Sequence, residues 1–229
     1  MEVRQDPDKS KPAVAFSQPS IEVDGFPIPY GEAGQGDALV CLQDGGLRLS
    51  GAHQLLAQRH RLIAFENPGL DRSRSTWLRA TSLRDLARVM TTAVSGLGID
   101  HFSIMADSSG AELALRMAIE RPQQIDAVVL LAPPAPHVTE PIRDVEFEES
   151  LASLEIPVLV MIGTNDRVGS PASAGIYREK LRNFHLIMVY GAGAAIDTDR
   201  PEAVAALIDD FLARGGAFIV RNRSGIIYP

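Results

Sequence analysis

The stretch FSIMADSSGA, residues 102–111, decides the fold of this 229-residue chain. Its first half is apolar and strand-like, its second half opens a helix, and Ser108 stands at the turn between them. A serine in so tight a turn adopts a strained backbone, which requires residues with almost no side chain two positions before and after it. Ala106 and Gly110 meet this requirement. The pattern predicts a nucleophile elbow that points the Ser108 hydroxyl out of the sheet, with an ordinary strand-to-helix turn as the alternative.

Strand-like and helix-like segments alternate on both sides of this turn. Apolar runs of strand length lie at 38–42, 61–65, 127–131 and 157–162, and 184–190 is predicted as a further strand. Helical patterns lie at 81–97, 171–181 and 201–214, and a further helix runs from the turn to the stop at Arg121-Pro122. Apolar runs buried on both faces belong to parallel sheets. We therefore predict an α/β fold with a mostly parallel central sheet, flanking helices and right-handed crossovers.

Nearly the whole chain resembles the α/β-hydrolase superfamily. Residues 28–36 look like that family's early hairpin. The segment PGLDRS at 68–73 looks like its Pro-Gly-x-Gly-x-Ser loop, with Asp71 in place of the second glycine. The resemblance implies a catalytic triad in the chain order nucleophile, acid, histidine, with Ser108 as nucleophile. The segment GTND at 163–166 follows a buried strand, where the family places its acid, so the resemblance assigns that role to Asp166. A plain turn residue is the alternative, because Asn-Asp pairs are common in turns.

The resemblance fails at the histidine. The family has Gly-x-Gly-His followed by Pro-Glu, whereas this chain has GAGA at 191–194 and then Pro201-Glu202. Ala194 stands at the histidine position and accepts no proton, so Ser108 would remain an un-ionised alcohol. The chain is either an inactivated variant of a working hydrolase or a natural member that kept the pocket and lost the chemistry. The joint presence of Ser108 and Asp166 favours the first interpretation.

The chain has five histidines, and one of them is a candidate substitute base. His60, His101 and His185 lie at or beside predicted strand starts, which belong to the edge of the sheet opposite the site. His53 begins the helix after the first glycine loop. His137 follows the end of a strand and so lies at the correct edge, either as a loop residue at the rim of the site or as a substitute base.

The resemblance also implies an oxyanion hole made by the backbone N–H groups of Gly45 and Ser109. The family begins the first of these loops with His-Gly, and this chain has Gln43-Asp44. The carboxylate of Asp44 would place negative charge near a developing oxyanion and so disfavour the usual ester chemistry. Asp107, beside the nucleophile, is a structural hydrogen-bond acceptor or, alternatively, a substrate contact.

We expect a single domain over residues 1–229, with 1–15 flexible. Only 137–154 is left for the helical cap that the family commonly carries, so we predict a short flap, little or no lid, and a small accessible substrate. The tail, 217–229, is strand-like. It is expected to pair with the sheet edge or with a second copy in a homodimer.

Composition excludes several classes of protein. A hydrophobic content of 45% suits one packed core, and no apolar run approaches membrane-spanning length. The net charge of −7 disfavours nucleic acid as a partner, and the polar start lacks the apolar core of a secretory signal, so we expect a cytoplasmic protein. The single cysteine, Cys41, excludes a disulfide framework, and no motif indicates a metal or another cofactor.

Together these patterns predict a serine hydrolase of an ester, thioester or lactone that works through an acyl-enzyme and lacks its base at Ala194. A ligand-binding protein on a hydrolase scaffold is the alternative from another class. Lyase or cofactor-free oxygenase chemistry on the same fold is a further alternative, and it shares the missing base. The substrate stays open because loops that the pattern does not fix form the pocket walls.

Overall fold

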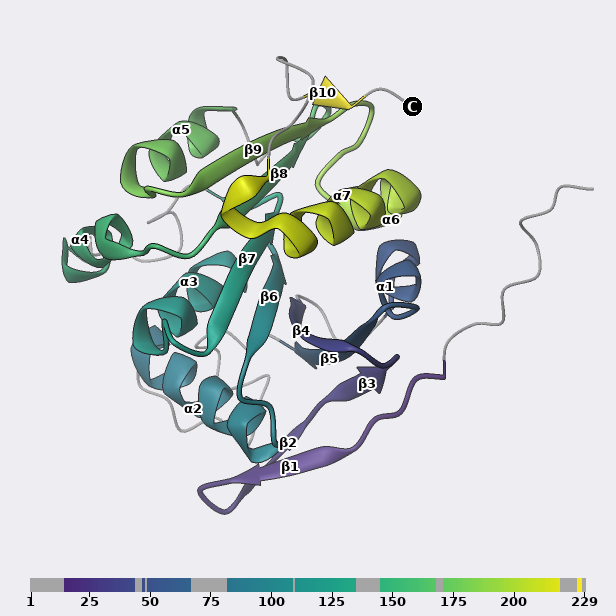
Figure 1. The fold of residues 1–229 in the computed structure, drawn as a ribbon, viewed down its shortest axis with the longest axis vertical. Helices are drawn as coiled ribbons and strands as arrows, with labels where there is room; N and C mark the ends of the chain where they lie inside the picture. The colour runs from purple at the N-terminus through teal and green to yellow at the C-terminus, as the bar shows by residue number, and fades with distance from the viewer. Residues whose placement is uncertain are drawn as a thin grey trace, which may run out of the picture.

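The computed structural model describes residues 15–43, 47, 49–66, 82–108, 110–134, 145–167, 171–218 and 226–227. Its centre is an eight-stranded sheet with the strand order β10-β9-β8-β7-β6-β4-β5-β3 (Figure 1). The strands are β3 (Gly31–Ala33), β4 (Asp37–Gln43), β5 (His60–Glu66), β6 (Phe102–Asp107), β7 (Ile125–Leu131), β8 (Val158–Gly163), β9 (Phe184–Val189) and β10 (Ile226–Ile227). Neighbouring strands are parallel except β3, which pairs antiparallel with β5. The predicted α/β class and mostly parallel sheet are confirmed.

Helices cover both faces of this sheet, as Figure 1 shows. One face carries α2 (Leu83–Gly96), α3 (Gly110–Glu120), α4 (Val145–Ser153) and α5 (Pro171–Lys180). The other face carries α1 (Gly51–Leu56), α6 (Ile196–Asp199) and α7 (Pro201–Arg214), which ends in a 3-10 turn, Gly215–Ala217. Successive strand residues point to opposite faces, so Val40 packs in the first core and Leu39 in the second. Both are fully buried, which explains why the strands read as continuous apolar runs.

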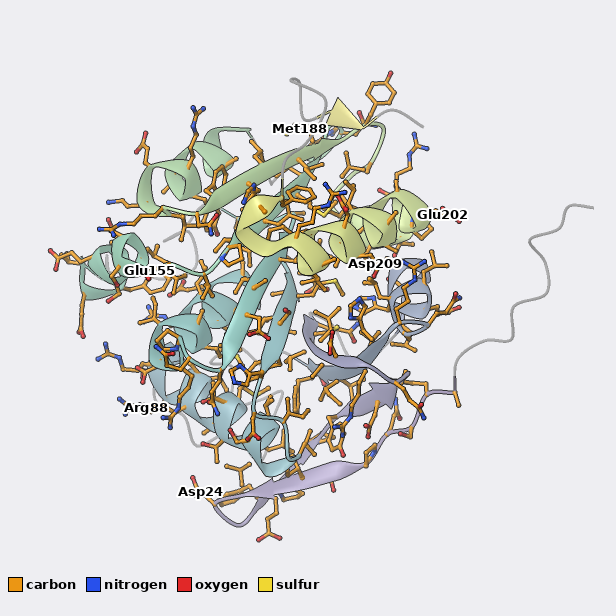
Figure 2. The ribbon with its side chains drawn as sticks, viewed as in Figure 1. Asp24, Arg88, Glu155, Met188, Glu202 and Asp209 are labelled. Atoms are coloured by element: carbon orange, nitrogen blue, oxygen red, sulfur yellow. The ribbon has the colours of Figure 1, made fainter. Side chains whose placement is uncertain are left out.

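The early hairpin has different bounds from those predicted. It is formed by β1 (Ser20–Val23) and β2 (Phe26–Pro29), a two-stranded antiparallel sheet of its own. Asp24 and Gly25 make its turn with φ values of 52° and 80°, the left-handed conformation that an Asp-Gly turn favours. Figure 2 shows Asp24 at the tip of this hairpin. The prediction of a hairpin over 28–36 was wrong because the backbone leaves the hairpin after β2 and β3 joins the main sheet.

Two further segments are described in part. Within the predicted flap, residues 145–153 form α4, and 137–144 lie outside the described residues. Within the predicted strand-like tail, β10 pairs in parallel with β9, so this part of the chain covers the sheet edge. The homodimer through the tail stays a prediction.

Candidate active site

Ser108 stands at the carboxyl end of β6 in a strained turn. Its φ is +36°, a left-handed value that residues with a side chain rarely adopt and that costs about 1–3 kcal/mol. The backbone N–H of Ser108 donates to the carbonyl of Leu131 (3.0 Å), and its own carbonyl accepts the N–H of Ala111 (3.2 Å). These bonds fix the turn between β7 and α3, and Ser108 itself is exposed. The turn thus has the strained geometry that the sequence pattern predicts.

The small residues around Ser108 are required by the close packing of α3 on the sheet. A Cβ atom on Gly110 would lie 3.2 Å from the carbonyl oxygen of Leu42 and 3.3 Å from its Cβ. Ala106 is fully buried on the same side. Larger residues would therefore push the start of α3 away from β4 and change the direction in which Ser108 points.

Hydrogen bonds join the turn after β8 to the loop after β9. The N–H of Asn165 donates to the carbonyl of Ala192 (2.9 Å), and the N–H of Gly191 donates to the hydroxyl of Thr164 (2.9 Å). The N–H of Thr164 itself extends the β8–β9 pairing with a bond to Val189 (3.0 Å). Three hydrogen bonds, two of them purely backbone, therefore hold the two segments in one arrangement.

Gly163 allows this close approach. A Cβ atom there would lie 2.3 Å from the carbonyl oxygens of both Ala192 and Gly193, a distance that no real side chain tolerates. Asp166 follows in the same turn, its N–H donates to the carbonyl of Gly163 (3.1 Å), and its Oδ2 atom is buried. Ala194 is exposed in the facing loop. The structure therefore brings the predicted acid turn against the loop where the family's histidine would stand.

The three predicted triad positions lie at one edge of the sheet. Ser108 follows β6, Asp166 follows β8 and Ala194 follows β9, and the carboxyl ends of parallel strands meet at the same edge. The remaining predicted site residues, Gly45, Ser109 and His137, lie outside the described residues, as does the loop at 68–73. The oxyanion hole and the substitute base stay predictions.

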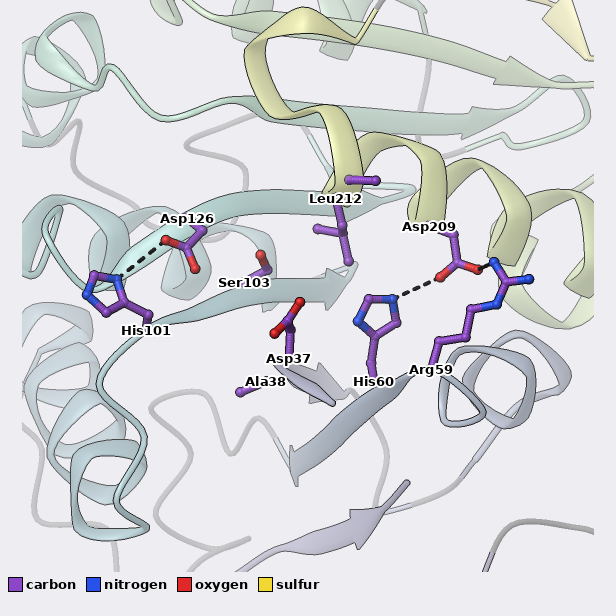
Figure 3. A pocket seen from close by; sticks show the side chains of 10 residues that line it. Asp37, Ala38, Arg59, His60, His101, Ser103, Asp126, Asp209 and Leu212 are labelled. Carbon is purple, nitrogen blue, oxygen red and sulfur yellow. Dashed lines mark hydrogen bonds and ion pairs between the residues drawn. The ribbon is translucent and has the colours of Figure 1, made fainter. Parts of the chain in front are cut away.

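Two histidines lie at the opposite edge of the sheet, as the sequence indicates. There, His60 and His101 line a cavity of about 460 Å³ (Figure 3). The Nε2 atom of His60 is 2.9 Å from a carboxylate oxygen of Asp209 on α7, and Nδ1 of His101 is 3.5 Å from a carboxylate oxygen of Asp126. These pairs stand at strand starts, so neither imidazole is available to Ser108.

His185 is also remote from the site and packs among aromatic rings. Its ring makes edge contacts with Phe211 and Phe218, at centroid distances of 5.7 and 5.5 Å. Partial burial lowers the pKa of His185 below its ordinary value, because the uncharged ring is favoured there.

Sequence reasoning missed a buried polar cluster formed by β4, the start of α1 and α6. We call it the His53 cluster, and its members are Gln43, Ser50, His53 and Asp197. The Nδ1 atom of His53 is 2.7 Å from the Ser50 hydroxyl and 3.7 Å from a carboxylate oxygen of Asp197, and its Nε2 atom is 3.1 Å from the Gln43 amide nitrogen. Ser50 also caps the start of α1 by accepting the N–H of His53. The helix-capping serine is the one part of this cluster that a sequence pattern could have indicated.

The described part of the chain offers no group of three or more His, Cys, Asp or Glu side chains that could hold a metal ion. None of its helices has both the length and the apolar character needed to cross a bilayer.

Burial raises the pKa of the Cys41 thiol far above its ordinary value, so the thiol stays protonated and behaves as an apolar core group.

A family model described as the alpha/beta hydrolase fold matches residues 50–147. The chain is 27% identical over 119 residues to 2-hydroxy-6-oxo-6-phenylhexa-2,4-dienoate hydrolase of Comamonas testosteroni, a match to 49% of this chain and 42% of that protein. The protein of the same name from Burkholderia cepacia is 29% identical over 115 residues, 47% of this chain and 40% of its own length. The match therefore spans less than half of either curated relative.

Among solved structures, naproxen esterase (carboxylesterase NP) from Bacillus subtilis superposes with a TM-score of 0.73 at 15% identity, covering 86% of this chain and 92% of that one. At this identity the likeness concerns the fold. The strand order, the strained serine turn and these comparisons together show that the chain has the α/β-hydrolase fold.

Proposed function

We propose that the chain is a serine hydrolase of a small, accessible ester, thioester or lactone, and that it is inactive or severely impaired because Ala194 replaces the base. One observation carries this proposal. Hydrogen bonds join the turn that contains Asp166 to the loop that contains Ala194. Both lie at the edge of the sheet where Ser108 stands in its strained turn. This arrangement supports a triad from which only the side chain at position 194 is missing.

The proposed chemistry is acyl transfer. With an imidazole at position 194, the Ser108 hydroxyl would lose its proton to the ring while its oxygen attacks the substrate carbonyl. The leaving alcohol or thiol would take that proton, and water would then release the acid from the acyl-enzyme. Asp166 would orient the imidazole and stabilise its charged form. No cofactor takes part in these steps.

A non-catalytic ligand-binding protein on the same scaffold is the second candidate, and the observation that favours it is Ala194 itself. Lyase or cofactor-free oxygenase chemistry would need the same base. The two curated relatives are named for an oxo-dienoate rather than an ester, so a substrate of that kind belongs in any panel used to test the activity.

The test is Ala194→His. Because position 194 is exposed, the new ring meets no packed neighbour, and we expect hydrolysis of small activated esters to rise at least about a thousandfold. Adding Ser108→Ala should remove the gain. Ala195→His is the matched control. Ala195 is the next residue in the chain, is also exposed and lies at the start of α6, so a histidine there should not increase the rate of hydrolysis.

A folded Ala194→His protein that hydrolyses no ester, thioester, lactone or oxo-dienoate above background would favour the ligand-binding protein. Labelling of the unmodified chain gives a second measurement. An activated fluorophosphonate should react with Ser108 slowly or not at all. Rapid stoichiometric labelling would show that another base acts, and His137→Ala should then abolish it.

A further inference from the structure

The His53 cluster is a buried polar group that the proposed chemistry does not use. Its four side chains come from β4, the start of α1 and α6, and their residues are exposed by only 2% (Gln43), 7% (Ser50), 3% (His53) and 5% (Asp197). Polar groups removed from water need hydrogen-bond partners, and buried polar networks hold their members in one arrangement. The cluster therefore fixes the relative positions of three segments.

The contacts of the imidazole favour one protonation state. An amide nitrogen only donates, so the Gln43 nitrogen at 3.1 Å makes Nε2 of His53 the acceptor. The ring proton then lies on Nδ1, where it points to the Ser50 hydroxyl at 2.7 Å. The Asp197 carboxylate, 3.7 Å from the same nitrogen, favours the proton there as well. With the Gln43 amide in this orientation, these contacts fit the Nδ1–H tautomer of His53.

The cluster joins the two sides of the candidate site. Gln43 is the last residue of β4, whose neighbour in the sheet is the Ser108-bearing strand, with Leu42 paired to Ala106. Asp197 lies in the turn of helix that follows Ala194, on the face of the sheet that α1 also covers. The loop of Ala194 is tied to the same helix, because the N–H of Gly193 donates to Asp199 (2.7 Å).

We propose that His53 is a positioning residue of the hydrolase site. By accepting from Gln43 and donating to Ser50, with the Asp197 carboxylate 3.7 Å from the same Nδ1 atom, it sets the spacing between the end of β4 and α6, and so the place of position 194 relative to Ser108. It does not touch the substrate. This inference rests on the proposed function. A displacement of about 1 Å at a catalytic group costs on the order of a hundredfold in rate, so the loss of either contact should be visible in kcat.

The kinetic test uses the Ala194→His background. His53→Gln keeps an acceptor near the place of Nε2, His53→Asn keeps a donor near the place of Nδ1, and neither keeps both. We expect each to lower kcat by roughly ten- to a hundredfold with KM little changed, and His53→Phe to lower it most. His60→Gln is the matched control, since it breaks another imidazole–carboxylate pair at the far edge of the sheet and should leave kcat and KM unchanged.

If the His53 variants fail to fold, Gln43→Met serves instead, because it removes the amide donor at similar volume and should give the same loss of kcat. Folded variants with undiminished kcat would overturn the inference. An inactive Ala194→His protein would instead count against the proposed function. The tautomer is then decided separately, by long-range ¹H–¹⁵N spectra of the unmodified chain. They should show Nδ1–H at His53, and Nε2–H would overturn the proposal.

Discussion

Replacing Gly163 by alanine should separate the two loops of the candidate site. The added Cβ would lie 2.3 Å from two carbonyl oxygens, whereas carbon–oxygen contacts normally stand at about 3.3–3.6 Å, so the loop of Ala192 must retreat by about 1 Å. Overpacking of this kind costs about 1–3 kcal/mol, and the bond from Asn165 to Ala192 is worth about 1 kcal/mol more. We therefore expect Gly163→Ala to lower the free energy of unfolding by about 2–4 kcal/mol.

Urea denaturation followed by circular dichroism measures this change. Gly175→Ala is the matched control, because a Cβ there meets nothing within 4 Å and the residue lies inside α5, so the substitution should stabilise the protein by about 0.5–1 kcal/mol. In the Ala194→His background, Gly163→Ala should also lower kcat by about a hundredfold. A Gly163→Ala protein within about 0.5 kcal/mol of its parent would refute the close approach of the two loops.

Two further outcomes follow from the structure. His185 has a lowered pKa, so its stabilising contribution is complete above the ordinary pKa of about 6.5 and is lost as the pH falls toward the lower folded value. Urea midpoints measured between about pH 5 and 7 should therefore fall on acidification, and less so in His185→Phe. Arg116 is largely buried, pairs with Glu112 at 2.6 Å and covers the Phe147 ring at 4.3 Å. Arg116→Ala should cost about 3 kcal/mol, against about 0.5 kcal/mol or less for Arg214→Ala, which breaks an exposed pair with Asp210, and equal costs by urea denaturation would contradict this.

The sheet and the serine turn could be predicted because their signals are local. A strand buried on both faces is apolar throughout, and the turn at Ser108 needs small residues at fixed neighbouring positions. The hairpin bounds were missed because Gly31 begins a three-residue edge strand, which is too short to show alternation. The His53 cluster was missed because its members meet only after β4, α1 and α6 have packed. A histidine at a helix start gives no indication, in sequence alone, that its ring will be buried.

The backbone bonds that hold the Ala194 loop have a consequence for how such a site can change over time. The side chain at position 194 takes no part in them, and it is exposed, so its identity adds little to the stability of the fold. The activity proposed for this position would therefore be separable from folding. Under the proposed function, a lineage could therefore lose or regain the base without passing through an unstable intermediate, and an engineer could install other proton acceptors at the same position.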